Sequence, residues 1–348
     1  MAECSCTSSD SSYEVKNIKI AIESLQYGGI IASYECTATC PHCLYACSPK
    51  RRNDYICVEM VRHICFALRE KGCDTIHIGG GEPFVNLEGL VALAKVIIDE
   101  GIKIKFVETN AFWVNDYSIE VIEMLQEIGV SALSISIDPF HLEYIPYGNP
   151  LLLARLCKEV GMKYGLWKNK YVKILSALDS SITYTYNDLE DIFKNVDIVA
   201  EYGVTYGGRA ISFEKSKFPR WEADELANSQ PCKCLSSGNH FHVDLYGRYI
   251  PAYECTGIFI PLNEIVVGLP SNKYPVFEAL YENGIMGLYR YALSKCFIPD
   301  PTGYSSTCAM CFYIRGWLSR NAPSPELDTS YYMASFNEER KCEEIMFA

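Results

Sequence analysis

The fold of this chain is decided by residues 28–43, which read GGIIASYECTATCPHC. The opening GGIIASY is an apolar run typical of a buried strand. The rest is a loop that places three cysteines within eight residues, separated by spacers of three and two residues. This spacing lets three thiolates face one cubane iron–sulfur cluster and leaves one iron without a protein ligand. A structural zinc site is the alternative, with His42 or Cys47 as the fourth ligand.

The composition of the chain already disfavours several classes of function. The chain has 348 residues, 49% of them hydrophobic, and a formal net charge of −12. An acidic surface disfavours binding to nucleic acids or anionic membranes, because both need clustered positive charge. No secretory signal and no apolar run of about 20 residues is present, so we expect a cytoplasmic protein without membrane contact. The 17 cysteines then indicate reduced thiols used as metal ligands rather than a disulfide framework.

Short apolar runs alternate with amphipathic helical stretches over the first 215 residues, which predicts an α/β fold. Parallel strands joined by right-handed helical crossovers form a sheet that curls, with ligand chemistry at the carboxyl ends of its strands. We expect strands at 28–34, 75–79, 102–109, 132–137, 171–178 and 204–212, and helices at 58–71, 87–100, 116–128, 151–163 and 187–195.

Changes in composition divide the chain into four expected parts. Residues 1–27 form an N-terminal extension with a possible helix at 15–27, and residues 28–215 carry the strand–helix array. Residues 216–230 are charged and irregular and are expected to be a linker. Residues 231–348 are rich in Cys, Gly, Pro and Tyr and predict a small domain that apolar burial alone would not stabilise.

The CxxxCxxC loop after the first strand closely resembles the signature of the radical SAM superfamily. The resemblance implies a partial (βα)6 barrel in which Cys36, Cys40 and Cys43 hold a [4Fe–4S] cluster. It also implies that the open iron binds S-adenosylmethionine and that one electron yields a 5′-deoxyadenosyl radical that abstracts hydrogen. An external donor such as flavodoxin or ferredoxin would supply that electron. His42 matches a position that packs near the adenine, although a surface turn residue is the simpler interpretation.

The ends of the second and third expected strands carry motifs that match this family. Residues 79–83 read GGGEP; taken alone, they indicate only a tight turn that needs glycine. In the family, Gly80 and Gly81 let the backbone approach the cofactor, and the carboxylate at Glu82 meets the methionine ammonium. After the third strand, Asn110 matches a polar residue that is turned toward the cofactor.

Polar residues in the next strands complete the set implied by the resemblance. Ser134, Ser136 and Asp138 alternate and should share one face of the fourth strand, where the family contacts the ribose and carboxylate of S-adenosylmethionine. A hydroxyl bonded to neighbouring backbone is an equal alternative for Ser134. Arg209 resembles the arginine of a GRA sequence and could clamp the cofactor carboxylate, or pair with Glu82 or Asp138.

A second group of cysteines follows a segment, 240–251, that reads as a hairpin containing the sequence DLYG. This arrangement resembles the SPASM and twitch extensions and implies one auxiliary iron–sulfur cluster, expected to be [4Fe–4S]. A zinc staple is the alternative. The four expected ligands are Cys234, Cys255, Cys308 and Cys311, with Cys232 and Cys296 as substitutes.

Local features such as CPHCLYACSP, TNAFW and SIDPFH resemble radical SAM peptide epimerases and other enzymes that modify ribosomal peptides. Epimerisation needs a hydrogen-donating thiol, so either Cys255 is that donor or Cys255 is a cluster ligand and the chemistry differs. Tyr253 could carry hydrogen instead, and the candidate catalytic residues are Cys255, Tyr253 and Cys47. The segment before residue 28 is too short for a leader-binding domain. Alternatives are an enzyme acting on a small molecule or cofactor precursor, and a zinc-stapled binding protein.

Overall fold

The computed structural model describes residues 20–51, 54–194, 197–213, 218–227, 232 and 234–336. Its centre is one eight-stranded sheet with the order β5-β4-β3-β2-β1-β6-β7-β8, parallel from β5 to β6 and antiparallel from β6 to β8. The strands are β1 (Gly28–Ile31), β2 (Thr75–Gly79), β3 (Lys103–Thr109), β4 (Ala132–Ser136), β5 (Lys163–Trp167), β6 (Phe241–Asp244), β7 (Arg248–Ile250) and β8 (Ile260–Pro261). The helices are α1 (Val58–Glu70), α2 (Leu87–Asp99), α3 (Ile119–Ile128), α4 (Gly148–Val160), α5 (Lys170–Leu175), α6 (Tyr186–Ile192), α7 (Ile198–Tyr202), α9 (Ala223–Leu226), α10 (Leu262–Val267), α11 (Pro275–Ser294), α12 (Thr307–Asn321) and α13 (Thr329–Ser335).

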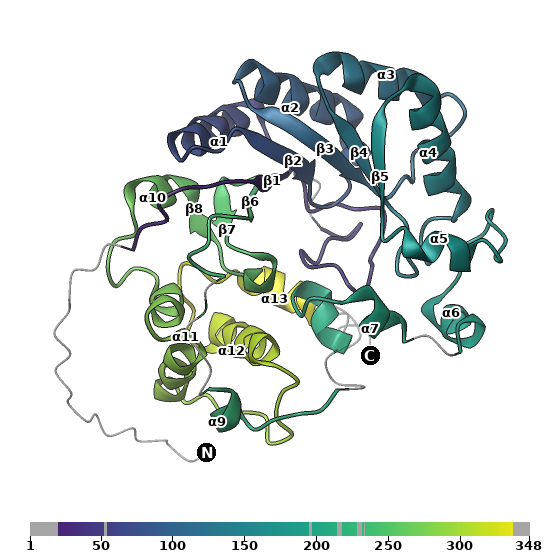
Figure 1. The fold of residues 1–348 in the computed structure, drawn as a ribbon. Coiled ribbons are helices and arrows are strands. Elements are labelled where there is room, and N and C mark those ends of the chain that lie inside the picture. Colours follow the sequence, from purple (N-terminus) through teal and green to yellow (C-terminus); the bar gives the residue numbers. More distant parts are fainter. Residues whose placement is uncertain are drawn as a thin grey trace.

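The predicted α/β partial barrel is confirmed, and its core lies between the sheet and its helices. Helices α1 to α4 cover one face of the curled sheet, and α11 to α13 lie beyond the opposite side (Figure 1). Ile30, Ile78 and Leu133 are fully buried in the strands. Each such side chain contributes roughly 2 kcal/mol through removal of apolar surface from water. Among the described residues, no helix combines the length and apolar character needed to cross a bilayer.

Three sequence-based assignments are wrong. Residues 171–178 do not form the fifth strand; that strand is Lys163–Trp167, and α5 follows it. Residues 204–212 do not form a sixth strand, because Gly208–Phe213 is a 3-10 turn and β6 takes the place beside β1. In the described part of the expected helix at 15–27, residues 20–27 are not helical. The rest of that helix lies outside the described residues.

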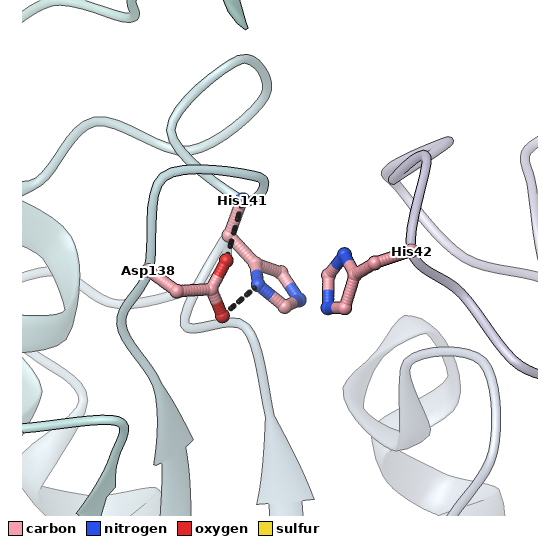
Figure 2. Close-up of side chains that lie close together, drawn as sticks. All are labelled: His42, Asp138 and His141. Atoms are coloured by element: carbon pink, nitrogen blue, oxygen red, sulfur yellow. Dashed lines mark hydrogen bonds and ion pairs between the residues drawn. The ribbon is translucent and has the colours of Figure 1, made fainter. Parts of the chain in front are cut away.

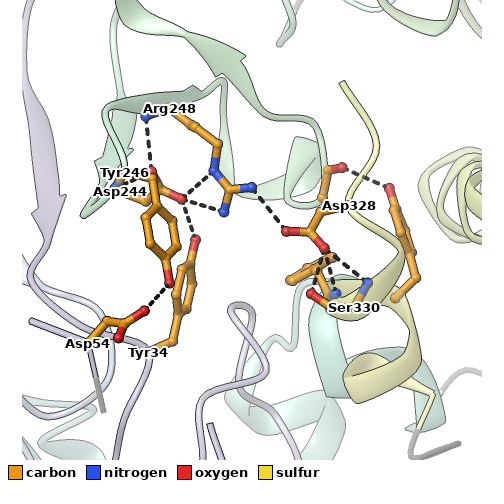
Figure 3. Close-up of polar contacts among 10 residues, drawn as sticks. Tyr34, Asp54, Asp244, Tyr246, Arg248, Asp328 and Ser330 are labelled. Carbon is orange, nitrogen blue, oxygen red and sulfur yellow. Dashed lines mark hydrogen bonds and ion pairs between the residues drawn. The ribbon is translucent and has the colours of Figure 1, made fainter. Parts of the chain in front are cut away.

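The hairpin predicted at 240–251 is present, and a buried ion pair joins it to the rest of the molecule. Asp244 is fully buried, and its carboxylate accepts hydrogen bonds from Tyr34 after β1, from Arg248 on β7, and from the backbone of the turn. Arg248 also pairs with Asp328, 3.0 Å away, which caps the N-terminus of α13 (Figure 3). One carboxylate therefore connects the barrel, the hairpin and the C-terminal helices.

The Asp244→Ala substitution is expected to lower the free energy of unfolding by about 3 kcal/mol, because it leaves the Arg248 guanidinium without its buried partner. Asp74→Ala is the matched control, since the Asp74–Lys103 pair is exposed and should cost less than about 1 kcal/mol. Denaturant unfolding followed by circular dichroism measures both values. Equal losses in the two variants would contradict the role given to Asp244.

Candidate functional site

A cavity of about 320 Å³ lies at the carboxyl ends of β1 to β5. One wall is the loop of residues 36–47, hereafter the cysteine loop, and the others come from the ends of the following strands and from the hairpin region. Most residues singled out in the sequence line it, but Asp138 and the C-terminal cysteines Cys234, Cys255, Cys308 and Cys311 do not. The predicted residues that line it are Cys36, Cys40, His42, Cys43, Cys47, Gly80, Gly81, Glu82, Asn110, Ser134, Ser136, Arg209 and Tyr253.

Arg209 holds the cysteine loop from inside the protein. Its side chain is buried, and its guanidinium donates hydrogen bonds to the carbonyl oxygens of Cys40, at 3.0 Å, and Cys47, at 2.6 Å. Its backbone N–H donates to the carbonyl of Cys43. The resemblance predicted that Arg209 clamps the cofactor carboxylate, with a pair to Glu82 or Asp138 as the alternative. In the structure the guanidinium instead binds backbone carbonyls of the loop.

Tyrosines from two other elements bind further carbonyls of the cysteine loop. Tyr331 on α13 donates a 2.6 Å hydrogen bond to the carbonyl of Leu44, and Tyr144 donates to that of Thr39 at 3.0 Å. The loop has no helix or strand of its own, and apart from two internal turns its backbone acceptors find partners elsewhere in the protein. The position of the thiols therefore depends on residues far away in the sequence.

Close backbone packing joins the turn after β2 to the segment before Cys36. The N–H of Gly81 donates to the carbonyl of Ser33 at 2.8 Å, and the N–H of Glu82 donates to that of Glu35 at 2.9 Å. A Cβ on Gly81 would lie 1.8 Å from the carbonyl oxygen of Glu35. Glycine is required here because the two backbones touch.

The Glu82 carboxylate is buried and already has three hydrogen-bond donors. It accepts from Thr109 Oγ1 at 2.9 Å and from the N–H groups of Asn110, at 2.7 Å, and Phe84, at 3.2 Å. Burial raises the pKa of Glu82 to about 7, although these donors oppose the shift. The carboxylate thus fixes the chain after β3 against the turn after β2.

Asp138 contacts a histidine rather than the cavity. Ser134 and Ser136 line the cavity as the alternation predicted, but β4 ends at Ser136 and Asp138 lies in the turn beyond it. Its carboxylate accepts from the backbone N–H of His141 and lies 2.8 Å from His141 Nδ1 (Figure 2). Their interaction lowers the pKa of Asp138 to about 2 and raises the pKa of His141 well above its usual value. Burial alone would shift each pKa in the opposite direction. Asp138 therefore keeps His141 protonated.

His42 projects from the cysteine loop toward His141 (Figure 2). Its ring lies 4.6 Å from that of Phe140 and edge-on to His141 at 5.2 Å. Burial lowers the pKa of His42 to about 3, so this imidazole is neutral. Its Nδ1 atom is buried without a hydrogen-bond partner in the protein. The orphaned nitrogen faces no solvent, which argues against a surface turn role for His42.

The thiols of the cysteine loop differ in their surroundings. A hydrogen bond from the Cys47 thiol lowers the pKa of Cys43 well below its usual value, and Arg209 adds to this effect. Burial raises the pKa of Cys36, whose sulfur also lies 3.8 Å from Asn110 Nδ2. Among the described residues, the set of three donor atoms that lie within 4.8 Å of one another is His42, Asp138 and His141, and it contains no cysteine of the loop. A tetrahedral zinc ion, with Zn–S bonds of about 2.3 Å, needs a tighter set, whereas a cubane puts each thiolate on a different iron.

The C-terminal cysteines form a second group away from the cavity. Hydrogen bonding between Cys232 and Cys255 lowers the pKa of Cys232 to about 6 and raises that of Cys255. Arg315 is fully buried beside Cys255 and Cys311, and it donates to the carbonyl oxygens of Thr256 and Glu254. Electrostatic contacts also join this group to Cys308 and Cys234, whereas Cys296 is exposed at the end of α11.

Several residues that line the cavity were missed from the sequence. Trp167 ends β5 and Lys168 follows it, and both were missed because that strand was placed eight residues too late. The sequence did contain a signal for the end of the preceding helix, namely Gly161. This glycine ends α4 in the left-handed conformation, so a strand can begin right after it. Glu108 and His242 also line the cavity, and only the strand pairing brings them there.

Comparisons with known proteins agree with this arrangement. A family model described as the radical SAM superfamily matches residues 30–206, about half of the chain. The GTP 3′,8-cyclase of Peptoclostridium acidaminophilum is 32% identical over 133 residues. That match covers 36% of this chain and spans 39% of the length of the curated relative.

Three solved structures are matched at low sequence identity, each with a TM-score below 0.5. The anSMEcpe structure with bound AdoMet has a TM-score of 0.44 and 14% identity, covering 93% of this chain and 98% of that one. BtrN in complex with AdoMet and 2-DOIA has a TM-score of 0.38 and 10% identity, covering 75% and 89%. Streptococcus suis SuiB bound to the precursor peptide SuiA has a TM-score of 0.34 and 14% identity, covering 89% and 76%.

The Gly81→Ala substitution is expected to lower the free energy of unfolding by about 2 kcal/mol, because the new methyl group forces the two backbones apart. Gly165→Ala on β5 is the control: a Cβ there meets no atom within 4 Å, and the change should stay within about 0.5 kcal/mol. Denaturant titration of both variants gives the comparison. If both prove equally stable, the contact between Gly81 and Glu35 does not restrain the cysteine loop.

Proposed function

This chain belongs to the radical SAM superfamily, and we propose that it abstracts hydrogen from a peptide substrate held in the 320 Å³ cavity. The observation that carries the proposal is the set of three thiols, Cys36, Cys40 and Cys43, which line one wall of that cavity beside Gly80–Glu82. Their sulfur atoms do not form a set of three within 4.8 Å of one another, which suits a [4Fe–4S] cluster better than a single ion. When bound, the cluster and S-adenosylmethionine supply the one-electron cleavage that yields the hydrogen-abstracting 5′-deoxyadenosyl radical, with flavodoxin or ferredoxin as donor.

The residues around the thiols would position both groups. Arg209 keeps the loop carbonyls in place. Gly80 and Gly81 line the cavity, but the space that a Cβ would take at each is filled by Ile31 and by the backbone of Glu35, so they serve the packing of the turn after β2. Ser134, Ser136 and Asn110 present polar groups to the same cavity. His42 offers a neutral ring with an unpartnered nitrogen, which would suit contact with the adenine. Glu82 acts by fixing Asn110 and Phe84, because its own oxygens already accept three hydrogen bonds.

The C-terminal cysteines would hold one auxiliary cluster, and Arg315 supports this part of the proposal. A fully buried guanidinium needs a counter-charge, yet Arg315 forms no ion pair with a carboxylate among the described residues. Its neighbours are thiols, and a cluster bound by four thiolates supplies negative charge. Because Cys232 contacts Cys255 directly, we favour Cys232, Cys255, Cys308 and Cys311 as ligands, with Cys234 as the spare thiol.

A peptide is the preferred substrate because exposed aromatic side chains border the cavity. Trp167 is 54% exposed and Tyr253 is 39% exposed, and both line it from separate parts of the chain. Such rings suit contact with a chain that inserts one side chain. The second candidate is a small molecule, favoured by the match to a GTP 3′,8-cyclase. Incubating the reduced enzyme with GTP, and separately with the peptide from a neighbouring short reading frame, followed by mass spectrometry, distinguishes the two.

Tyr253 is the favoured hydrogen carrier of the three candidate catalytic residues. It lines the cavity, whereas Cys255 is buried among other thiols and does not. Cys47 lines the cavity, but its thiol is engaged with Cys43. Epimerisation through Cys255 is therefore less well supported than chemistry in which Cys255 is a ligand.

Replacing Cys36, Cys40 or Cys43 by Ala is expected to abolish the formation of 5′-deoxyadenosine from S-adenosylmethionine under reducing, anaerobic conditions. Loss of one ligand removes the anchoring of the cluster. Cys57→Ala is the control, since Cys57 is exposed before α1 and should keep wild-type activity. Chromatography of the reaction mixture measures the product. Activity retained in the loop variants would refute the proposed function.

The double variant Cys308→Ala/Cys311→Ala is expected to lose about four of eight irons per chain after reconstitution, because one [4Fe–4S] cluster is no longer held. Cys232→Ala should lose the same iron, and Cys296→Ala should lose none. Iron and sulfide analysis gives the counts, and Mössbauer spectra identify the cluster type. A full iron content in the double variant, or zinc in place of iron, would contradict the auxiliary cluster.

A further inference from the structure

The cavity has a second side that the cysteine loop does not form. Its residues are Phe106 and Glu108 on β3, His242 on β6, and Tyr253 after the hairpin. The His242 ring lies 5.6 Å from that of Tyr253, and Phe106 stacks at 4.9 Å on His77, the partner of His242. We call these four lining residues the Glu108 side. Nothing in the cofactor arrangement proposed above uses them.

Glycines on two strands make room for this side of the cavity. A Cβ on Gly79 would lie 2.4 Å from Oε2 of Glu108. A Cβ on Gly29 would lie 2.4 Å from Nε2 of His77 and 2.6 Å from Cδ2 of His242. A larger residue at Gly29 or Gly79 would therefore fill the space that the Glu108 carboxylate and the two imidazoles occupy.

The Glu108 carboxylate is open to the cavity and has no close cationic partner in the described part of the protein. Its side chain is 46% accessible, and it faces the cavity. Unlike Glu82, it accepts no hydrogen bond from the described residues, and its one ion-pair contact among them is with His77 Nε2 at 4.0 Å. Burial lowers the pKa of His77 to about 3 and that of His242 well below its usual value, so neither supplies a positive charge. Although the cavity leaves its side chain partly accessible, the surrounding protein, with Glu82 adding to it, raises the pKa of Glu108 to about 7.

Ammonium groups match these surroundings best. A cation pairs with a carboxylate through charge-assisted hydrogen bonds, and it is also attracted to aromatic rings such as those of Phe106 and Tyr253. The cationic side chains that line the cavity are engaged elsewhere: Arg209 binds the cysteine loop, His141 binds Asp138, and Lys168 donates to the carbonyl of Tyr202.

We propose that Glu108 binds an amino group of the substrate and thereby selects amine-bearing substrates. The inference rests on the proposed function, because it assumes that the substrate enters this cavity. It assigns Glu108 to substrate binding and leaves S-adenosylmethionine to the side formed by the cysteine loop. A lysine side chain of a peptide and a small primary amine share this chemistry.

The test compares n-butylamine with n-butanol, which differ in the charged group, on the reconstituted protein with S-adenosylmethionine bound. Ligand-observed NMR at pH 7 gives the two dissociation constants. Wild type should bind the amine about tenfold more tightly, as expected for one charge-assisted hydrogen bond. In Glu108→Gln the preference should vanish, whereas Glu59→Gln, at an exposed position on α1, should keep it.

Three results would overturn the proposal: equal binding of both probes by wild type, binding of neither, or an amine preference that survives in Glu108→Gln. A Glu108→Gln protein that no longer binds S-adenosylmethionine would also overturn it, because Glu108 would then belong to the cofactor side. Failure of the proposed function is seen separately, as absence of 5′-deoxyadenosine in the wild-type assay.

A second pair of probes distinguishes a peptide lysine from a small primary amine as the source of the amino group. A peptide substrate is supported by two results together. The blocked Gly-Lys-Gly peptide binds more tightly than n-butylamine, and this binding is lost when norleucine replaces the lysine. A blocked peptide that binds less tightly than n-butylamine assigns the subsite to a small amine and supports Glu108 in that role.

Discussion

The structure depends on the hydrogen bonds that Arg209 makes to the cysteine loop. One buried residue binds three carbonyl oxygens, those of Cys40, Cys43 and Cys47. Within the loop, the N–H groups of Cys43 and Ala46 already bind the carbonyls of Cys40 and Cys43; Arg209 adds to these turns and supplies a donor for the carbonyl of Cys47. Arg209 therefore fixes where the three thiols point, and the cavity forms around them.

The same solution is used at the second group of cysteines. Arg315 is fully buried, binds backbone carbonyls after the hairpin, and lies beside Cys255 and Cys311. Among the described residues, neither Arg209 nor Arg315 pairs with a carboxylate. Each guanidinium thus combines two tasks: it satisfies acceptors in an irregular segment, and it places positive charge where thiolates would bind a metal cluster.

Hydrogen bonds and ion pairs also join the C-terminal helices to the cysteine loop and to the hairpin. Tyr331 joins α13 to the cysteine loop, and Asp328 at the start of the same helix pairs with Arg248 of the hairpin. Asp244 completes the path to Tyr34, which lies three residues after the end of β1. The C-terminal region is therefore part of the support of the cavity, and β6 extends the barrel sheet itself.

The sequence alone determined the strand–helix order through β4, the three thiols and the glycine turn, because periodicity, helix stops and ligand spacing are local properties. It failed at 171–178, where a short apolar run fits a strand or a helix equally well, and at Asp138, where β4 had already ended. Only the tertiary structure decided the partners of Arg209 and the place of Glu108 in the cavity. Both depend on which strands and loops become neighbours, and long-range contacts leave no periodic signal in the chain.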